Sequence, residues 1–473
     1  MVKIMSMEHE YGLIHRSNIS NDPMSLACKI YNSVKEFSLV ENNSIRKHLR
    51  NGSQIYVDLR HIEIALPECS NPRSVVLYDI AASSILKKIA DKKDILVFKN
   101  NLDSGGISFG CHENYFLDIR LLKENLKIRN KIETKDFYYS CISKISSFLI
   151  PFLITRPIIA GSGYISENKY LLSQRATIIK EDISHGTLEN RAIINVRNEP
   201  YSKTGIRLHL ISGDSNMSEY TNYLKIGTTS LVLTMLENGV QFSEIRVINP
   251  VETLREINNK KINSEINGLR IISEKPGLGK YFTISEEIPS SPLEIQRIYL
   301  EKTKEFLASN KNPSLPWAEK LVREWEFVIN SLQEDPLSLN RHIDWVIKKF
   351  LIIEYIKSKK IKIYDEKAKK IDLCYHLISN NGGFNFYSGL LGLEKIVTEE
   401  ETKKAISSPP EDTRAYGRTK ILEAILAKKT NFFRLAKKAK KIDFSWNFVS
   451  HFGDSFSLPE PYESYSNLIP DIK

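Results

Sequence analysis

The residues of this chain that are best suited to chemistry lie far apart, yet together they are what one site for phosphate and a metal would need. They occur in six short strings: MEHEYG (7–12), QIYVD (54–58), FKNN (98–101), GCHENY (110–115), RLHL (207–210) and GDSNMSE (213–219). A hard divalent cation takes oxygen ligands and keeps room in its shell for the phosphates of a nucleotide. The strings therefore predict a catalytic site that is assembled from distant segments.

Asp58 is the first candidate for a catalytic group. It follows Tyr56 by two positions in QIYVD, so both side chains point to the same face of a predicted strand. A carboxylate in such a place can act as a general base or as a nucleophile if its neighbours tune it. The same pattern also fits an ordinary aspartate that makes a turn at the end of a strand.

Glu8 and Glu10 are also two positions apart, in MEHEYG, and they would share one face of a strand. Two carboxylates so close repel each other unless a cation lies between or near them. Mg²⁺ needs only one or two protein carboxylates, because waters and phosphates complete its shell. The alternative is an exposed strand with charged residues on its outer face.

His112 and His209 each lie on a predicted strand beside a residue that could handle phosphate. Asn114 follows the first histidine, and Arg207 precedes the second. Arginine suits phosphate because its fork donates two aligned hydrogen bonds. A lone histidine is more often a satisfied core or surface residue, so this pattern needs the other strings for support.

Short apolar segments alternate with helical ones through the first 300 residues. The predicted strands are Gln54–Leu59, Asp94–Lys99, Tyr115–Ile119, Ala192–Val196, Arg207–Ser212 and Leu269–Ile272. The predicted helices are 22–36, 72–91 and Asn222–Glu237, the last ending at Asn238-Gly239, which is a good stop signal. This alternation favours a sheet with helices packed on it over a β-sandwich.

The second half of the chain is mainly helical. Residues 293–309, 317–333 and 339–357 have apolar residues at helical spacing. After the turn-rich string SSPPED (407–412), residues 413–441 are predicted to form a basic helix. We expect a small C-terminal domain over 401–473, after a larger domain over 1–400.

Composition narrows the class of protein. The net charge of +10, from 67 basic and 57 acidic residues, permits an anionic ligand, but no nucleic-acid-binding pattern accompanies it. Five cysteines without a CxxC pair indicate reduced thiols in a cytoplasmic protein. The start of the chain has no signal-peptide pattern, and the apolar run 147–161 is too short and too broken by prolines to span a bilayer. That run is better explained as a buried helix or a pair of strands.

In their order, the six strings resemble those of the Pup ligase and depupylase family, and the resemblance extends from about residue 5 to about residue 458. Members of that family are glutamine-synthetase-like enzymes that attach or remove a small protein modifier. The resemblance implies an α/β fold, with a large domain in which helices pack on a curved, mainly antiparallel sheet cradle, plus the small C-terminal domain.

The resemblance also implies roles for individual residues and for ligands. Asp58 corresponds to the catalytic aspartate. The implied magnesium ligands are Glu8, Tyr56, Glu63, His112 and His209, and the implied ATP-binding residues are Ser6, Glu10, Asn114, Arg207 and Trp446. The cofactors would be ATP and Mg²⁺, and the partners a small acidic Pup-like modifier and its conjugates, with the enzyme a monomer. Trp446 is equally well explained as a core residue of the small domain.

Two branches of the family share this site but differ in reaction. The ligase phosphorylates the terminal carboxylate of the modifier with ATP, after which a lysine attacks; the depupylase hydrolyses an amide at the same carbon. Several strings are similar to depupylase sequences: EYG (10–12), GSG (161–163), GTT (227–229), IQRIYL (295–300), DTRAY (412–416) and SWNFVSHFGDS (445–455). A long insertion that depupylases usually carry before RNG (50–52) is absent, and GCHENY and IDWVIKK (343–349) are similar to ligases.

On balance these strings predict a depupylase-like or deamidase-like hydrolase acting on the terminal Gln/Glu of a Pup-like modifier or on its isopeptide bond to lysine. The alternatives are a Pup–protein ligase working through a glutamyl phosphate, a carboxylate–amine ligase for another peptide or small molecule, and a catalytically silent binding protein. The chain departs from the family where it has HIEI (61–64) for HPEY and RNEPYSK (197–203) for RDEPHAD. It also has Gln54 and Leu66 where the ligase has an arginine and a threonine that contact nucleotide.

Overall fold

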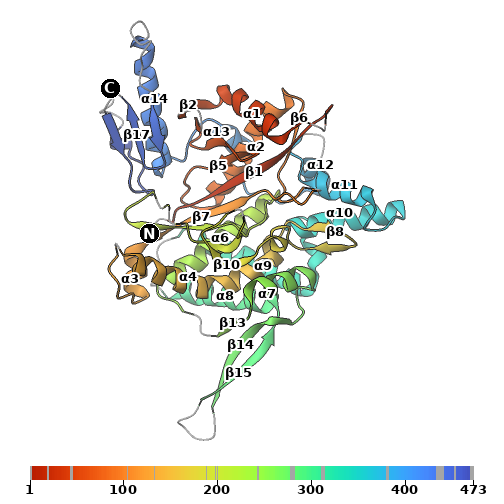
Figure 1. Cartoon of the computed structure of the whole chain (residues 1–473). Helices are drawn as coiled ribbons and strands as arrows, with labels where there is room; N and C mark the ends of the chain where they lie inside the picture. Colours follow the sequence, from red (N-terminus) through yellow and green to blue (C-terminus); the bar gives the residue numbers. More distant parts are fainter. Residues whose placement is uncertain are drawn as a thin grey trace. The chain divides into compact units, whose positions relative to one another are not determined.

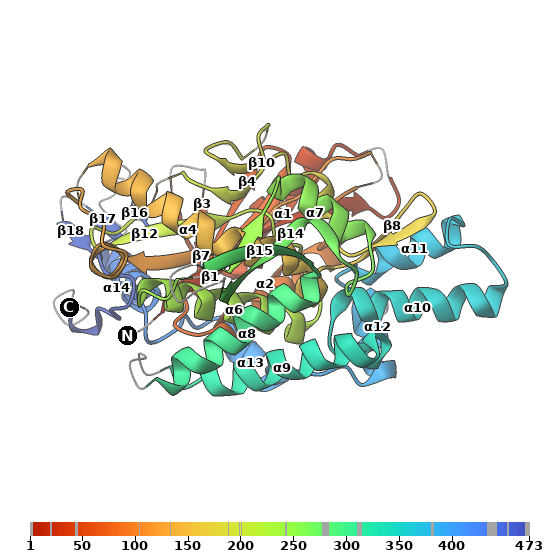
Figure 2. The same cartoon turned by 90° about the horizontal axis from the view of Figure 1, so that it is seen from below.

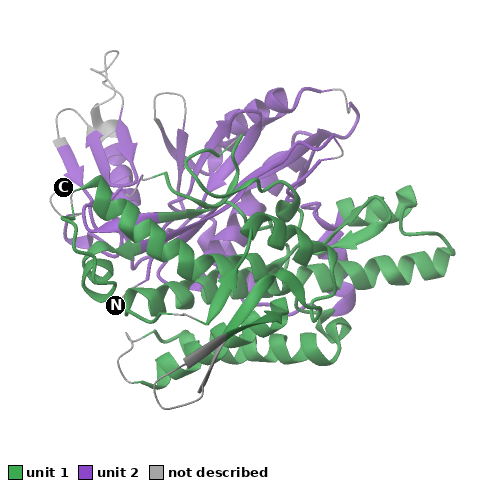
Figure 3. Ribbon diagram, turned by 60° about the horizontal axis from the view of Figure 1, so that its bottom comes forward, with its two compact units in different colours: residues 1, 117–198, 208–373 green, residues 2–116, 199–207, 374–473 purple. Residues whose placement is uncertain are grey.

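The computed structural model describes residues 3–18, 21–42, 46–103, 105–132, 134–187, 189–197, 199, 201–241, 244–276, 283–309, 315–379, 383–432, 442–451 and 454–468. The chain divides into two compact units (Figure 3). Unit 1 holds Met1, Leu117–Asn198 and Leu208–Leu373, and unit 2 holds Val2–Phe116, Glu199–Arg207 and Cys374–Lys473. The C-terminal residues thus belong to the same unit as the N-terminal ones, and the boundary at residue 400 stays a prediction.

Unit 2 is organised around an antiparallel sheet. Its strands are β1 (Met5–His15), β2 (Ser38–Asn42), β3 (Arg46–Leu49), β4 (Gln54–Asp58), β5 (His61–Ala65), β6 (Ile95–Phe98) and β7 (Cys111–Asp118). They are hydrogen-bonded in the order β7-β1-β5-β4-β3-β2, with β6 also paired to β1. The strand order continues from β7 to β12 (Gly205–Leu210) and β11 (Ala192–Asn195), and then to β10 (Glu181–Ser184), which is parallel to β11.

Alternation of side chains along β1 separates a buried face from a polar face. Met5, Met7 and His9 are buried, whereas the side chains of Glu8 and Glu10 on the other face are 15% and 14% exposed. Helices α1 (Pro23–Ser33) and α2 (Pro72–Asp91) pack against β1, and α1 also against β4 and β5 (Figure 1). The buried face therefore forms the core with the two helices and leaves the acidic face open.

The remaining helices and strands of unit 1 are α3 (Ile119–Asn125), α4 (Lys135–Thr155), α5 (Pro157–Ala160), α6 (Glu219–Glu237), α7 (Pro250–Asn259), α8 (Pro292–Ala308), α9 (Ala318–Glu334), α10 (Asp344–Lys359), and the strands β8 (Tyr164–Ser166), β9 (Lys169–Leu171), β13 (Ile245–Val247), β14 (Ile266–Pro276) and β15 (Thr283–Ser290). Of these elements, the sequence predicted α6, α8, α9 and α10 and part of β14. Helix α11 (Glu366–Tyr375) crosses the division between the units. Helices α8 and α9 run side by side (Figure 2) and both pack on α6. As predicted, α6 stops at Asn238 and Gly239, whose φ of +80° closes the helix end.

Helix α4 contains most of the apolar run that was expected to be a buried helix or a pair of strands, and it is a helix. By length and composition it could cross a membrane, but 67% of its most apolar window is buried inside the structure. Such burial is typical of a core helix. Pro151 lies inside α4, and the carbonyl of Pro151 accepts a hydrogen bond from Thr155 Oγ1 at 2.8 Å.

The C-terminal segment of unit 2 contains α12 (Gly383–Leu391), α13 (Glu399–Ala405), α14 (Arg414–Phe432), β16 (Asp443–Ser445), β17 (Phe448–His451) and β18 (Asp454–Ser457). Ile421, Leu422 and Phe444 form a core cluster, against which Leu39 and Val40 of β2 also pack. The segment is therefore joined to the edge of the sheet. The helix predicted over 413–441 is confirmed as far as Phe432, and most of its basic end lies outside the described residues.

Candidate active site

Antiparallel pairing brings the predicted site residues together across four strands. Glu8 on β1 lies opposite His112 on β7. Glu10 lies opposite Glu63 on β5, and Glu63 lies opposite Tyr56 on β4. Residues that are opposite in such a pair lie on the same face of the sheet. A single polar face thus carries candidates whose sequence positions differ by about a hundred residues.

Three carboxylates gather at one place on this face. Glu10, Asp58 and Glu63 each offer an oxygen, and these oxygens lie within 4.8 Å of one another. Burial, together with the negative charges of Glu8 and Glu10, raises the pKa of Glu63 well above its usual value. Tyr56 partly offsets this by donating a hydrogen bond from its hydroxyl to Glu63 Oε1 at 2.8 Å. A divalent cation would offset the repulsion between the three carboxylates, and this set of hard oxygen donors fits Mg²⁺.

Asp58 is the most accessible member of this group, at the exposed end of β4. Burial of part of the carboxyl and the charge of Glu10 raise its pKa, while His112 and His61 act in the opposite direction. The next residue, Leu59, has a φ of +50°, which is uncommon for a bulky side chain. The tight turn therefore presents Asp58 at the rim of the carboxylate group, where a substrate can reach it.

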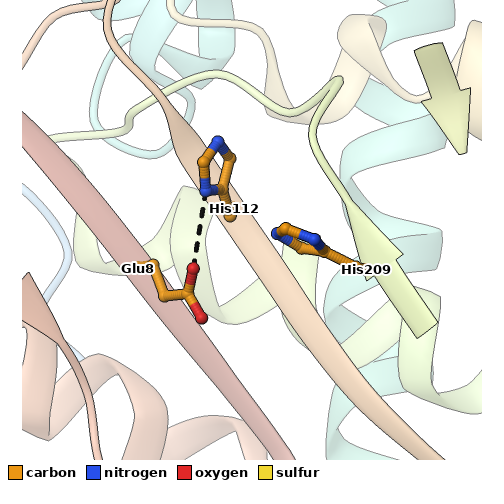
Figure 4. A group of neighbouring side chains, drawn as sticks. All are labelled: Glu8, His112 and His209. Atoms are coloured by element: carbon orange, nitrogen blue, oxygen red, sulfur yellow. Dashed lines mark ion pairs between the residues drawn. The ribbon is translucent and has the colours of Figure 1, made fainter. Parts of the chain in front are cut away.

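Glu8 is the centre of a second group of contacts. Its Oε1 accepts hydrogen bonds from Asn114 Nδ2 at 3.0 Å and from Arg207 Nη2 at 3.2 Å. Arg207 Nε also donates to Asn114 Oδ1 at 2.7 Å. His112 Nδ1 lies 3.5 Å from Glu8 Oε2, and His209 contributes a third candidate ligand atom, all three within 4.8 Å of one another (Figure 4). The structure thus brings the predicted metal and phosphate residues together, while their individual roles stay predictions.

A pocket opens beside Glu8 in unit 2. It is lined by Ile4, Met5, Ser6, Glu8, Leu66, Glu68, Asn114, Tyr115, Phe116, Tyr201, Arg207, Arg414, Trp446 and Pro461. Four of the five residues predicted to bind ATP, namely Ser6, Asn114, Arg207 and Trp446, are among them. The fifth, Glu10, lies instead in the carboxylate group.

Sequence reasoning missed part of this pocket. Glu68, Tyr201 and Arg414 line it without having been assigned a role. The sequence signal for Arg414 was the string DTRAY (412–416), and its partner is buried Glu68, whose Oε1 accepts a hydrogen bond of 2.7 Å from Arg414 Nε. Two opposite charges that are both buried must be paired, because a single buried charge without a partner is strongly destabilising. The sequence does not show which charged residues form the pair.

Two of the six strings serve the core. Lys99 of FKNN is buried and pairs with Asp79 of α2, with Nζ at 2.6 Å from Oδ2. Asp214 of GDSNMSE accepts hydrogen bonds from Ser162 and Ser173 within unit 1, both at 2.9 Å. Arg175 is also buried in unit 1 and donates from Nε to the carbonyl of Ile211 at 3.0 Å. These residues stabilise the unit to which each belongs.

Comparison with known families and proteins identifies extensive relatives. The sequence profile of the family described as Pup-ligase protein matches residues 3–435. The Pup–protein ligase of Kineococcus radiotolerans is 32% identical over 452 residues, which covers 91% of each chain. The Pup–protein ligase of Actinosynnema mirum is 35% identical over 404 residues, which covers 81% of each chain.

Solved structures agree with these sequence matches. A crystal structure of the complex between the prokaryotic ubiquitin-like protein Pup and its ligase PafA matches with a TM-score of 0.80 and 25% identity, covering 100% of this chain and 92% of that one. A structure of PafA in complex with ADP matches with a TM-score of 0.74, covering 96% and 94%. The predicted α/β fold is thereby confirmed.

The prediction of the depupylase branch, and with it of a hydrolase, is wrong. The relatives that match along most of the chain are Pup–protein ligases. Several strings that favoured the hydrolase lie in the core: Thr228 and Thr229 of GTT are fully buried in α6, and Gln296 and Tyr299 of IQRIYL are fully buried in α8. Packing constrains such positions whatever the direction of the reaction, so their similarity carried little information about it.

Proposed function

Because the chain belongs to the Pup-ligase family, we propose that it uses ATP to join the side-chain carboxylate of the C-terminal glutamate of a small Pup-like modifier to the side-chain amine of a lysine on a target protein. The observation that carries this proposal is the position of the carboxylate group beside a pocket that Asn114, Arg207 and Trp446 line. Glu8 belongs to both places, since it lines the pocket and its charge raises the pKa of Glu63. A phosphate bound in the pocket and the carboxylate of the modifier would therefore meet beside Glu8.

We assign the pocket to ATP and the acidic side chains to Mg²⁺. Glu8, Glu10 and Glu63 would hold the metal, which when bound supplies positive charge to the phosphates. Arg207 would orient a phosphate with its planar fork, and it is already fixed by Asn114 and Glu8. The ADP-bound structure of PafA supports this assignment.

The chemistry then takes two steps. An oxygen of this glutamate side chain attacks the γ-phosphorus of ATP, so that a glutamyl phosphate forms and ADP leaves. The lysine amine next attacks the acyl carbon, and phosphate leaves as the isopeptide bond forms. Asp58 takes the proton that the amine must lose, a role for which an accessible carboxylate with a raised pKa is suited.

The proposed partner is a small acidic modifier protein. This choice is supported by the similarity to PafA in its complex with Pup and by the net charge of +10 of this chain. Opposite net charges speed association and favour the correct partner. We also propose a cytoplasmic location, which is supported by five cysteines that are all free.

The test is a conjugation assay with the full chain. Purified protein, ATP, Mg²⁺, a lysine-containing target and a modifier ending in Gly-Gly-Glu are incubated, and the products are followed by gel shift, by mass spectrometry of the linked peptide and by release of ADP. We expect a conjugate and ADP in equal amounts. The same modifier ending in Gly-Gly-Gln is the matched control, since it lacks the carboxylate to be phosphorylated. A chain that makes neither conjugate nor ADP with the Glu form would refute the proposal.

A further inference from the structure

Glu68, Arg414 and Arg418 form a buried ionic network, here called the Glu68 clamp. Arg418 donates to both carboxylate oxygens of Glu68, at 3.0 Å from Nη1 to Oε1 and at 2.7 Å from Nη2 to Oε2. Arg414 donates from Nε to Oε1 at 2.7 Å. The side chain of Arg418 is 0% exposed and that of Glu68 is 9% exposed. A carboxylate that meets two guanidinium groups in so dry a place is held in one orientation.

The clamp joins segments that are distant in sequence. Glu68 follows β5, whereas both arginines lie on α14, and 350 residues separate Glu68 from Arg418. Thr413 adds a further bond by donating from Oγ1 to the carbonyl of Glu68 at 2.8 Å. The N-terminal end of α14 is therefore fixed to the sheet of unit 2.

Both arginines also hold residues of the pocket wall. Arg418 donates from Nη1 to the carbonyl of Trp446 at 2.8 Å, and its guanidinium lies 5.0 Å from the centre of the indole ring. Arg414 donates from Nη1 to the carbonyl of Tyr201 at 2.6 Å. Trp446 and Tyr201 both line the pocket, but Arg418 does not. Arg418 can therefore affect a ligand in the pocket only through the residues that it positions.

We propose that Glu68 and Arg418 are positioning residues for the nucleotide, which act by fixing the indole of Trp446 at the wall of the pocket. The inference rests on the proposed function only in taking ATP as the ligand of this pocket. A guanidinium that both stacks on the indole and binds its backbone sets the position and the tilt of the ring. The C-terminal segment thus supplies Trp446 to the wall of the pocket. Arg418 holds this indole in place, and the carboxylate of Glu68 holds Arg418.

The test compares Arg418→Lys with Arg73→Lys. Lysine keeps the charge of Arg418 but loses the fork that reaches Glu68 and Trp446 together. Arg73 is the matched control, because it makes an exposed pair with Glu401 at 2.7 Å and lies outside the pocket. We expect Arg418→Lys to raise the KM for ATP and the Kd of a fluorescent ATP analogue about tenfold, as for the weakening of one base–aromatic contact, with kcat within about twofold of wild type. Arg73→Lys should change neither constant.

A double-mutant cycle with Trp446→Phe shows whether the effect passes through the indole. We expect Arg418→Lys to weaken ATP binding much less in the Trp446→Phe background than in the wild type. Unchanged ATP affinity in Arg418→Lys, a fall in kcat with an unchanged KM, or fully additive effects would each overturn the inference. All proteins are assayed at a temperature at which near-UV circular dichroism shows them folded. A wild-type protein that binds no ATP would refute the proposed function instead.

Discussion

Replacing Glu68 by glutamine should destabilise the folded chain strongly, and in a manner that depends on pH. Burial alone would raise the pKa of Glu68, but the Arg418 and Arg414 guanidinium groups outweigh it and lower the pKa from 4.5 to about 2. A lowering of this size corresponds to about 3 kcal/mol of stability at neutral pH, since each pKa unit is about 1.4 kcal/mol. Removing one partner of a buried ion pair commonly costs about 3–5 kcal/mol, so the two estimates of the loss of stability agree.

The pH dependence follows from the sign of the shift. Because the pKa is lower in the folded state, the stabilisation is complete above pH 4.5 and is lost as the pH falls toward 2. The difference in unfolding free energy between wild type and Glu68→Gln should therefore be about 3 kcal/mol or more at pH 7, and should shrink by about 1 kcal/mol at pH 3.5. Urea unfolding of both proteins, followed by circular dichroism, measures this difference at each pH.

Glu401 provides a matched control. Hydrogen bonds from Thr398 and the charge and hydrogen bond of Arg73 lower its pKa also to about 2, but its side chain is 37% exposed. Solvent screens such a pair, so Glu401→Gln should cost only about 0–1 kcal/mol, and glutamine can keep the capping box. A loss below about 1 kcal/mol for Glu68→Gln, or a loss that is the same at pH 7 and pH 3.5, would refute the reasoning.

Three further outcomes concern the carboxylate group. Asp58→Asn should lower the rate of conjugation by about 10²–10⁴-fold, as for the loss of a general base, while the Kd for ATP stays within about twofold; retained turnover would remove Asp58 from this role. Mg²⁺ binding at pH 7 should release protons and should weaken as the pH falls, because burial and the charges of Glu8 and Glu10 raise the pKa of Glu63. Calorimetry in buffers of different ionisation enthalpy measures the number of protons released. A value of zero would contradict the argument. Tyr56→Phe removes the hydrogen bond that favours ionised Glu63, so Mg²⁺ should bind about tenfold more weakly; equal Mg²⁺ affinity in a titration would show that this bond has no such effect.

The sequence predicted the polar face of the sheet well, because the spacing of its residues matches the period of a strand. Glu8 and Glu10, like Tyr56 and Asp58, do share a face. What spacing cannot give is the register between strands, so the sequence alone did not show that Glu63 would lie opposite both Glu10 and Tyr56. The family resemblance supplied that link.

The wall of the pocket could not be predicted in the same way. Arg414 and Arg418 lie in the segment predicted as a basic helix, and Glu68 was given no role, since an isolated charge in a sequence is usually a solvated surface residue. Only folding shows that these charges are buried together. The direction of the reaction was missed for a related reason, since buried strings such as GTT and IQRIYL reflect packing and say little about chemistry.

The long sequence separation within the Glu68 clamp also sets an order of events during synthesis. At about 5–20 residues per second, about 20–70 s pass between the addition of Glu68 and that of Arg418, which lies 350 residues later. For almost all of that interval the carboxylate of Glu68 lacks both guanidinium partners of the clamp, and Trp446, which lines the pocket that we assign to ATP, has yet to be made. A nascent chain, or one truncated before Trp446, can therefore fold part of its sheet while this wall of the pocket is missing, and under the proposed function its nucleotide site would be incomplete.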